Sequence, residues 1–294
     1  MRRTLPIALL LCLLPSCEGI GTPNKPAPPR ADSDDTRQLT GSLTWKSERQ
    51  ERTISVAKLV KDGRGETIES DDPYYKKIKR YRALALAPLI RKEFSSSDES
   101  LSKRTFLLQA SDGYAVRVSG EKLLHPAVYL AYADADHKSF QAIGERSQDP
   151  GPLYVVWKGS KFRNEKDYPR PWSLVKIELL PNDSDYKHTR PPGGFGKNVL
   201  AESGGLLFEK ACLRCHSINQ EGGTLGPDLN VPQNILAYRP EDQVRAYIKS
   251  PRTFRYSSMP DHSHLSERQL DSLVAYLRLM GKHRYDPQKS TRAP

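Results

Sequence analysis

The pentapeptide Cys212-Leu213-Arg214-Cys215-His216 organises the C-terminal part of this 294-residue chain. Two cysteines separated by two residues and followed at once by a histidine are the attachment signature of a c-type haem. The spacing fits the chemistry, because two thiols a helical turn apart add to the two vinyl groups of one haem and the next residue offers its imidazole to the iron. The sequence therefore predicts one covalent haem c, held through Cys212 and Cys215, with His216 as the proximal iron ligand.

A Cys-x-x-Cys pair also occurs in dithiol redox centres and in zinc sites. A zinc site requires two further ligands at matching spacing. The other two cysteines, Cys12 and Cys17, both lie near the N-terminus and form no such pair. The haem interpretation is therefore favoured over the redox and zinc alternatives.

The N-terminus has the pattern of an export signal. Two arginines precede the apolar run 5–14, which is too short for a transmembrane helix. The run ends in Leu14-Pro15-Ser16-Cys17, which resembles the bacterial lipoprotein cleavage box, whose cysteine becomes the lipidated first residue. We expect residues 1–16 to be removed and Cys17 to anchor the protein on the periplasmic side of a bacterial membrane. Because Pro15 is unusual in that box, a soluble periplasmic protein is the alternative.

The composition divides the rest of the chain into segments. Residues 17–40 are rich in Pro, Gly, Asp and Ser and bury too little apolar surface to fold, so a lipid anchor and linker are expected there. A second Pro- and Gly-rich stretch, residues 182–198, is expected to link two domains. These breaks predict an N-terminal domain over residues 41–181, a C-terminal domain over residues 199–285 and a tail over residues 286–294.

Helical patterns dominate the C-terminal domain. Residues 205–211 lead into the haem motif as a short helix, and residues 240–249 form a second one with proline and two acids in its first turn. The last helix is expected to start at Ser266, where Gln269 completes a capping box, and to end at Gly281. The sequence predicts an all-α domain.

The element Gly226-Pro227-Asp228-Leu229 is similar to the Gly-Pro-x-Leu element of bacterial class I cytochromes c. The C-terminal domain resembles this family. The resemblance implies that the Pro227 carbonyl accepts the Nδ1–H of the proximal histidine and fixes its tautomer. It also implies that the last helix crosses the first, through Tyr276 or Leu277 against Phe208 or Gly205.

The sixth iron ligand is expected from the loop before the last helix. The stretch Phe254-Arg255-Tyr256-Ser257-Ser258-Met259-Pro260 resembles the distal element of the same family, a methionine followed by proline. Met259 is the candidate, because Met1 leaves with the signal and Met280 falls in the last helical turn. Two strong axial ligands close the iron to substrates, which favours electron transfer over peroxidase or oxygen chemistry. The competing ligands are His262 and His264.

The N-terminal domain mixes short strands with turns. Residues 105–108 and 115–118 are expected to form two strands around the turn at Asp112-Gly113. Residues 154–157 and 172–179 are further β-rich runs, and the second alternates with period two. Several strands in one segment predict a sheet.

One helix is expected among these strands, over residues 81–87, because Pro88 should stop it. The fold class expected for the whole chain is therefore two domains. The N-terminal domain is expected to be α+β, mixed and β-rich, and the C-terminal domain is expected to be an all-α cytochrome c domain.

Four short motifs resemble the sulfite-oxidase-type molybdopterin-binding fold: Ser111-Asp112-Gly113-Tyr114, Leu130-Ala131-Tyr132, Gly151-Pro152-Leu153 and Trp172-Ser173-Leu174-Val175-Lys176-Ile177. Enzymes of that family hold molybdenum through a cysteine thiolate beside the pterin dithiolene. No cysteine stands between Cys17 and Cys212. The resemblance therefore implies a metal-free relative that serves as a scaffold, docking surface or binding module. An unrelated α+β domain is the alternative.

The chain carries a formal net charge of +11. Its basic run with interleaved tyrosines, residues 75–82, is a pattern also found in proteins that bind nucleic acid. An exported lipoprotein meets little nucleic acid, so no such partner is expected. The expected partner is a redox protein with an acidic docking face, and Lys249, Arg252 and Arg255 flank the Met259 loop where it would approach.

Two functions remain open. The first is a periplasmic, lipid-anchored monohaem cytochrome that transfers single electrons and is not itself an enzyme. The second is a haem-bearing subunit or sensor whose N-terminal domain binds a small molecule or a catalytic dehydrogenase partner. A low-spin ferric spectrum with a methionine–iron charge-transfer band favours the first function.

Overall fold

The computed structural model describes residues 39–144, 147–181 and 186–286. The expected signal peptide (residues 1–16), Cys17 and most of the expected N-terminal linker lie outside these residues. Within the described part of the chain, no helix combines the length and apolar character needed to cross a membrane.

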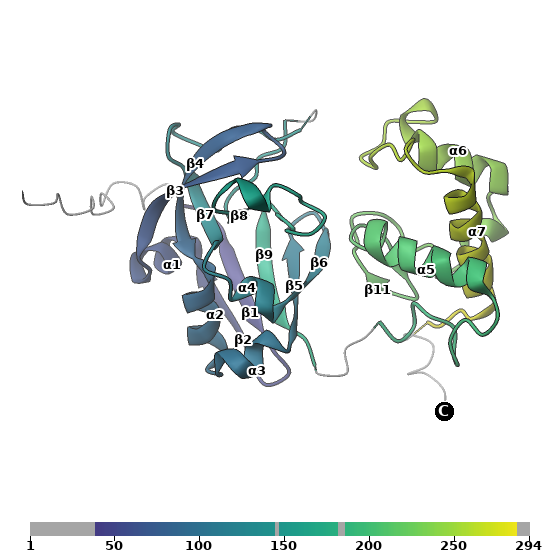
Figure 1. Cartoon of the computed structure of the whole chain (residues 1–294), viewed down its shortest axis with the longest axis horizontal. Helices are drawn as coiled ribbons and strands as arrows, with labels where there is room; N and C mark the ends of the chain where they lie inside the picture. Colours follow the sequence, from purple (N-terminus) through teal and green to yellow (C-terminus); the bar gives the residue numbers. More distant parts are fainter. Residues whose placement is uncertain (1–38, 145–146, 182–185, 287–294) are drawn as a thin grey trace, which may run out of the picture. The chain divides into compact units, whose positions relative to one another are not determined.

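The N-terminal region is built on two sheets (Figure 1). The larger sheet has the strand order β2-β1-β9-β5-β6, and its pairs are antiparallel except for β1 and β9. The smaller sheet has the order β3-β4-β7-β8 and is antiparallel throughout. The strands are β1 (Ser42–Lys46), β2 (Glu51–Ser55), β3 (Gly65–Asp72), β4 (Lys77–Ala85), β5 (Thr105–Ala110), β6 (Ala115–Ser119), β7 (Val128–Asp134), β8 (Tyr154–Trp157) and β9 (Leu174–Leu179).

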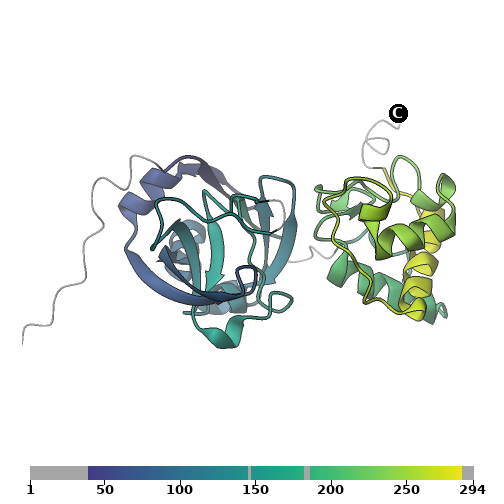
Figure 2. The same cartoon turned by 90° about the horizontal axis from the view of Figure 1, so that it is seen from above.

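One hydrophobic core lies between these sheets. It receives Trp45 and Phe106 from the larger sheet and Leu130 and Trp157 from the smaller one, all buried. Strand β5 alternates strictly between half-buried and buried positions, as a strand with one face on a core must. The strands curve around this core as a half-barrel (Figure 2), so the prediction of a β-rich N-terminal region is confirmed.

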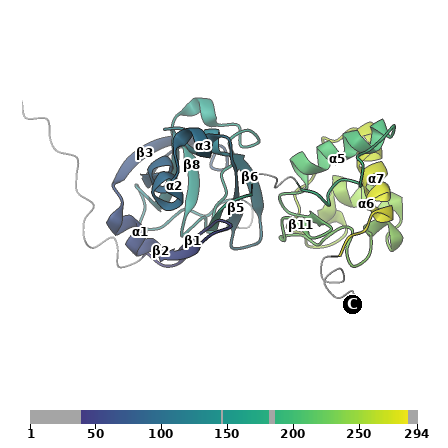
Figure 3. The same cartoon turned by 90° about the horizontal axis from the view of Figure 1, so that it is seen from below.

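Four short helices accompany these strands. They are α1 (Val56–Asp62), α2 (Leu86–Phe94), α3 (Asp98–Ser102) and α4 (Gly120–Leu123). Three of them, α1, α2 and α3, are labelled in Figure 3. The predicted helix over residues 81–87 is wrong, because β4 continues to Ala85 and α2 begins at Leu86. Pro88 lies in the first turn of α2, where its missing N–H is no loss, and so it marks the start of a helix instead of its end.

The basic run at residues 75–82 falls on β4 and the turn before it. Alternation along the strand buries Lys79, whose amine pairs with Asp134, while Ile78 is 66% exposed. Arg80 faces solvent and pairs with Asp136 at 3.0 Å. The run is therefore no continuous cationic surface, because one of its charges is buried and another is neutralised.

The C-terminal region is mostly helical (Figure 1), but the prediction of an all-α domain is not fully met, because a short two-stranded antiparallel sheet follows the haem motif. Its elements are α5 (Val199–Ala211), β10 (Ser217–Ile218), β11 (Glu221–Gly222), α6 (Glu241–Lys249), α7 (Glu267–Lys282) and the short 3-10 turns at Ile235–Ala237 and Pro251–Thr253. Helix α5 begins six residues before the expected Gly205. The capping box of Ser266 and Gln269 is present at the start of α7.

Helices α5 and α7 cross with almost no space between their backbones. A Cβ on Gly204 would lie 1.8 Å from the carbonyl oxygen of Ser272, so only glycine fits at the crossing. One turn later the rings of Phe208 and Tyr276 are 5.2 Å apart. The predicted crossing is confirmed, with its tightest point at Gly204.

The expected end of α7 at Gly281 is wrong, because the helix continues to Lys282. Gly281 lies in the last turn, where a Cβ would come within 3.1 Å of Asn234 Cγ. The residue is small because a buried asparagine packs against the helix there.

Candidate functional site

The Cys-x-x-Cys-His motif forms the turn that follows α5. The N–H of Cys212 donates to the Phe208 carbonyl at 2.8 Å, and the N–H groups of Cys215 and His216 both donate to the Cys212 carbonyl, at 3.0 and 2.9 Å. This turn brings both thiols and the imidazole together. All three side chains are half-buried, and the two thiols are free.

The protonation of the two thiols bears on the redox alternative. Burial raises the pKa of the Cys212 thiol to about 12 and that of Cys215 to about 11. Dithiol redox centres depend on a thiol whose pKa is lowered, because the thiolate is the nucleophile. These two thiols have the opposite property, so the site does not suit disulfide exchange.

The proximal imidazole is held by one hydrogen bond. Nδ1 of His216 lies 2.9 Å from the Pro227 carbonyl oxygen, so Nδ1 carries the proton and Nε2 keeps its lone pair for a metal. Burial lowers the pKa of His216, against the opposing effects of the Pro227 hydrogen bond and of Asp228. The ring is therefore neutral at neutral pH, which is the form that binds iron. The structure thus places the Pro227 carbonyl within hydrogen-bond distance of the His216 imidazole, as the resemblance implied.

Glycines let the following loop lie directly against the motif. The N–H of Gly226 donates to the Cys215 carbonyl at 2.7 Å, and a Cβ on Gly226 would lie 2.5 Å from the His216 ring. A Cβ on Gly223 would lie 2.1 Å from the Arg214 carbonyl oxygen. No larger residue fits at either position, so the glycines place the Pro227 carbonyl within reach of the imidazole.

Met259 lies in the loop between α6 and α7 and is half-buried. Its N–H donates to Ser257 Oγ at 3.2 Å, and the Tyr247 hydroxyl donates to the same oxygen at 3.0 Å. Arg255 Nε in turn donates to the Tyr247 hydroxyl at 3.1 Å. Side chains of α6 and of the loop therefore fix the backbone that carries the candidate distal ligand.

The competing ligands differ in their surroundings. Met280, on α7, is fully buried in the hydrophobic cluster that α5 and α7 share. His262 is half-buried, and burial, with the charges of His264 and His216, lowers its pKa. His264, by contrast, is exposed.

The residues around the motif suit a haem. Loops on both sides of α6 leave four large apolar side chains exposed. They are Leu225, Tyr238, Phe254 and Tyr256, the last 88% exposed. Two free thiols and one neutral imidazole in a single turn match the two vinyl groups and the iron of the cofactor.

The cationic side chains beside this loop are partly neutralised. Lys249 pairs with Glu267, and Arg245 pairs with Asp271. Arg255 Nε donates to the neutral Tyr247 hydroxyl, so Arg255 keeps its charge. The charge that an acidic partner would meet is therefore smaller than the sequence suggests.

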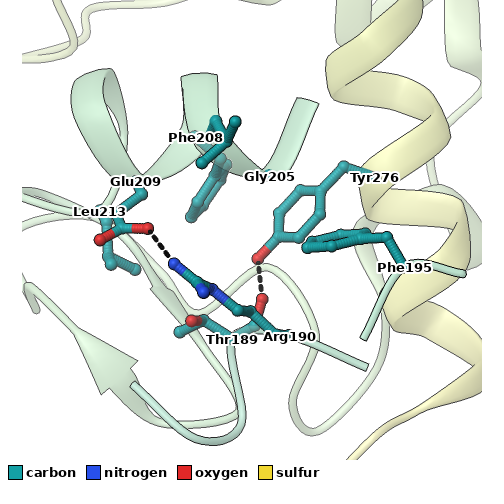
Figure 4. A pocket seen from close by; sticks show the side chains of 9 residues that line it. Thr189, Arg190, Phe195, Gly205, Phe208, Glu209, Leu213 and Tyr276 are labelled. Carbon is teal, nitrogen blue, oxygen red and sulfur yellow. Dashed lines mark hydrogen bonds and ion pairs between the residues drawn. The ribbon is translucent and has the colours of Figure 1, made fainter. Parts of the chain in front are cut away.

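A small hollow lies behind α5, on the side of Phe195 and Tyr276 (Figure 4). The Tyr276 hydroxyl donates to the Thr189 carbonyl at 2.7 Å, and Arg190 pairs with Glu209 at 3.1 Å across the rim. The lining contains no cysteine, histidine or methionine. The hollow is a packing feature of the helix pair, with no reactive group.

The N-terminal region holds a buried polar cluster that sequence reasoning missed. The Asp72 carboxylate accepts hydrogen bonds from the hydroxyls of Tyr81 and Tyr154, at 2.8 and 2.9 Å. Arg170, also buried, donates to Ser70 Oγ at 2.9 Å. No pattern in the sequence signalled this cluster, since its members lie far apart along the chain. Among the described residues, no group of three or more His, Cys, Asp or Glu is arranged to hold a metal ion.

Comparison with known proteins assigns the C-terminal region. The cytochrome c family model matches residues 201–280, which form a cytochrome c domain. Lupanine 17-hydroxylase [cytochrome c] from a Pseudomonas species is 31% identical over 113 residues, 38% of this chain and 16% of that protein. Cytochrome c oxidase subunit 2 from Alkalihalophilus pseudofirmus is 29% identical over 87 residues, 27% of this chain and 25% of that protein. The chain thus matches a quarter or less of each relative's length. A cytochrome c domain implies a covalently bound c-type haem and a role in electron transfer.

Proposed function

We propose that this protein is an exported, lipid-anchored cytochrome that passes single electrons between redox proteins through one haem. The observation that carries the proposal is the geometry at the motif, where two free thiols and a neutral imidazole with Nδ1 bound to Pro227 lie in one turn. The cytochrome c match to residues 201–280 supports it.

The haem, when bound, supplies an iron centre that gains and loses one electron. Cys212 and Cys215 hold the group by thioether bonds, and His216 is the proximal ligand. Met259 is the proposed distal ligand. The loop contacts of Ser257 and Tyr247 support this assignment, because they fix the backbone beside the thioether.

The partners we propose are redox proteins. Both relatives are, by their names, a redox enzyme and an oxidase subunit. Tyr256 and Phe254 are exposed on the loop that carries Met259, and Arg252 and Arg255 are their neighbours in the sequence. We propose that the two rings make apolar contacts with the partner and that the arginines attract its acidic face.

A two-domain arrangement is part of the proposal, with the N-terminal region as a metal-free module resembling the sulfite-oxidase-type fold. The separate hydrophobic clusters of the two regions support it. The second candidate function, a haem-bearing subunit or sensor, is favoured by the buried Asp72 and Arg170 cluster, which a carrier does not require.

Acid–acetone extraction of purified full-length protein tests the proposal. We expect the haem to stay with the denatured chain, and the ferric spectrum to be low-spin with a methionine charge-transfer band. Haem that leaves with the acetone would overturn the covalent assignment. A ferrous form that binds carbon monoxide readily would favour the sensor.

A further inference from the structure

The Asp228 side chain gathers the loop beside the proximal histidine. Its carboxylate accepts hydrogen bonds from the N–H groups of Gln220, Asn230 and Val231, at 2.6, 2.7 and 2.7 Å. Two of these donors follow Asp228 and one precedes it by eight residues. The carboxylate therefore ties together both ends of the loop that contains Pro227.

Backbone pairing fixes the same loop to the motif. Asp228 forms a parallel β-bridge with Ser217, and the N–H of Leu229 donates to the Ser217 carbonyl at 2.9 Å. Ser217 directly follows His216, and Asp228 directly follows Pro227. The bridge thus sets the imidazole and its acceptor carbonyl in register.

Three buried asparagines, Asn219, Asn230 and Asn234, connect the loop that contains Asp228 to α7. We call them the asparagine cluster. Asn230 Nδ2 donates to Asn219 Oδ1 at 2.7 Å and to the Met280 carbonyl at 2.9 Å. Asn234 Nδ2 donates to Asn230 Oδ1 at 2.7 Å and to the Leu277 carbonyl at 2.9 Å. The end of a rigid helix is thereby connected to the loop at Asp228.

We propose that Asp228 is a positioning residue that sets the reduction potential of the haem by holding the Pro227 carbonyl on His216 and by placing a negative charge beside that imidazole, with the asparagine cluster as its support. This inference rests on the proposed function. It assigns a role to residues outside the proposed iron ligands, His216 and Met259.

Asp228 is expected to lower the reduction potential of the haem through two effects. A firmly held acceptor makes the proximal imidazole a stronger electron donor, which stabilises ferric iron. A nearby carboxylate also stabilises the more positive ferric state through Coulomb attraction in a partly buried site. Both effects lower the reduction potential, so loss of Asp228 should raise it.

Asp228→Asn removes the negative charge and keeps the shape of the side chain. Asp228→Ser also removes the charge but keeps one oxygen that can accept from the N–H groups of Asn230 and Val231. We expect each variant to lower the ratio of oxidised to reduced protein at a fixed potential by about tenfold, or about 59 mV for one electron. Asp242→Asn is the matched control, because it removes the same charge from an exposed position on α6. We expect the control to leave that ratio within about twofold.

Asn230→Ser tests position without a change of charge. Loss of its bonds to Met280 and Asn219 should loosen the loop, and hydrogen exchange at His216 Nδ1 in the ferrous protein should become faster by NMR. A purely structural role would lower stability and leave the potential and this exchange rate unchanged.

The outcomes separate this inference from the proposed function. Wild-type protein without covalent haem would defeat the proposed function before any variant is compared. Wild-type protein that carries haem and cycles, with Asp228→Asn and Asn230→Ser at the wild-type potential and exchange rate, would overturn this inference alone. If both Asp228 variants lose their haem, Asn230→Ser decides it by the same two measurements.

Discussion

The hydroxyl of Tyr276 on α7 donates a 2.7 Å hydrogen bond to the backbone carbonyl of Thr189, 87 residues earlier in the chain. Tyr276 is 1% exposed and Thr189 is 6% exposed, so water does not replace this bond. Thr189 belongs to a segment that the composition predicts as a linker. The hydrogen bond thus holds the segment around Thr189 against α7.

Tyr276→Phe should therefore destabilise the protein by about 1–3 kcal/mol, since the Thr189 carbonyl is left buried without a donor. Denaturant unfolding of the haem-loaded protein measures the change. Tyr238→Phe is the control, because Tyr238 is 49% exposed, and it should alter the free energy of unfolding by less than about 0.5 kcal/mol. Equal effects of the two substitutions would contradict the role of the hydrogen bond.

Met259→Ala should leave an open or water-bound iron and lower the reduction potential, because the thioether ligand is lost. Redox titration and the ferric spectrum measure this. Met280→Leu is the control and should keep the wild-type spectrum, since Met280 is a core residue. If Met259→Ala keeps the wild-type spectrum and potential, the distal ligand is His262, His264 or Met280.

Labelled palmitate should enter the wild-type protein and fail to enter Cys17→Ser, because the thiol of Cys17 is the proposed acylation site. Cys12→Ser is the matched control and should be labelled as the wild type is, since residue 12 lies within the proposed signal peptide. Label that persists in Cys17→Ser would refute the anchor. Absence of label in all three proteins would favour simple secretion.

Residues 41–181 produced alone should fold and carry neither molybdenum nor pterin. The region has its own core between two sheets, which supports independent folding. It lacks a cysteine for the metal, and Lys79 of its basic run is buried against Asp134 instead of free for a phosphate. Elemental analysis after expression with an intact molybdenum-cofactor pathway checks this, and stoichiometric molybdenum would make the protein a haem-linked molybdoenzyme.

Local patterns in the sequence were enough to predict several features. The haem motif, the capping box of Ser266 and the hairpin around Asp112-Gly113 each depend on residues within one turn of one another. Such signals are read directly, because the chemistry of a turn is set by its own few residues. Such local patterns were not enough for Pro88. Proline occurs in the first turn of a helix as well as after its end, so Pro88 alone does not show whether a helix begins or ends there.

Tertiary structure alone decided which polar residues are buried together. Lys79 meets Asp134, 55 residues away, and Asn230 meets the Met280 carbonyl, 50 residues away. In the sequence Asn230 resembles an ordinary turn residue and Lys79 an exposed cation. Their partners are brought to them only when sheets and helices pack, because a buried polar group must find its hydrogen bonds wherever the fold places a donor or acceptor.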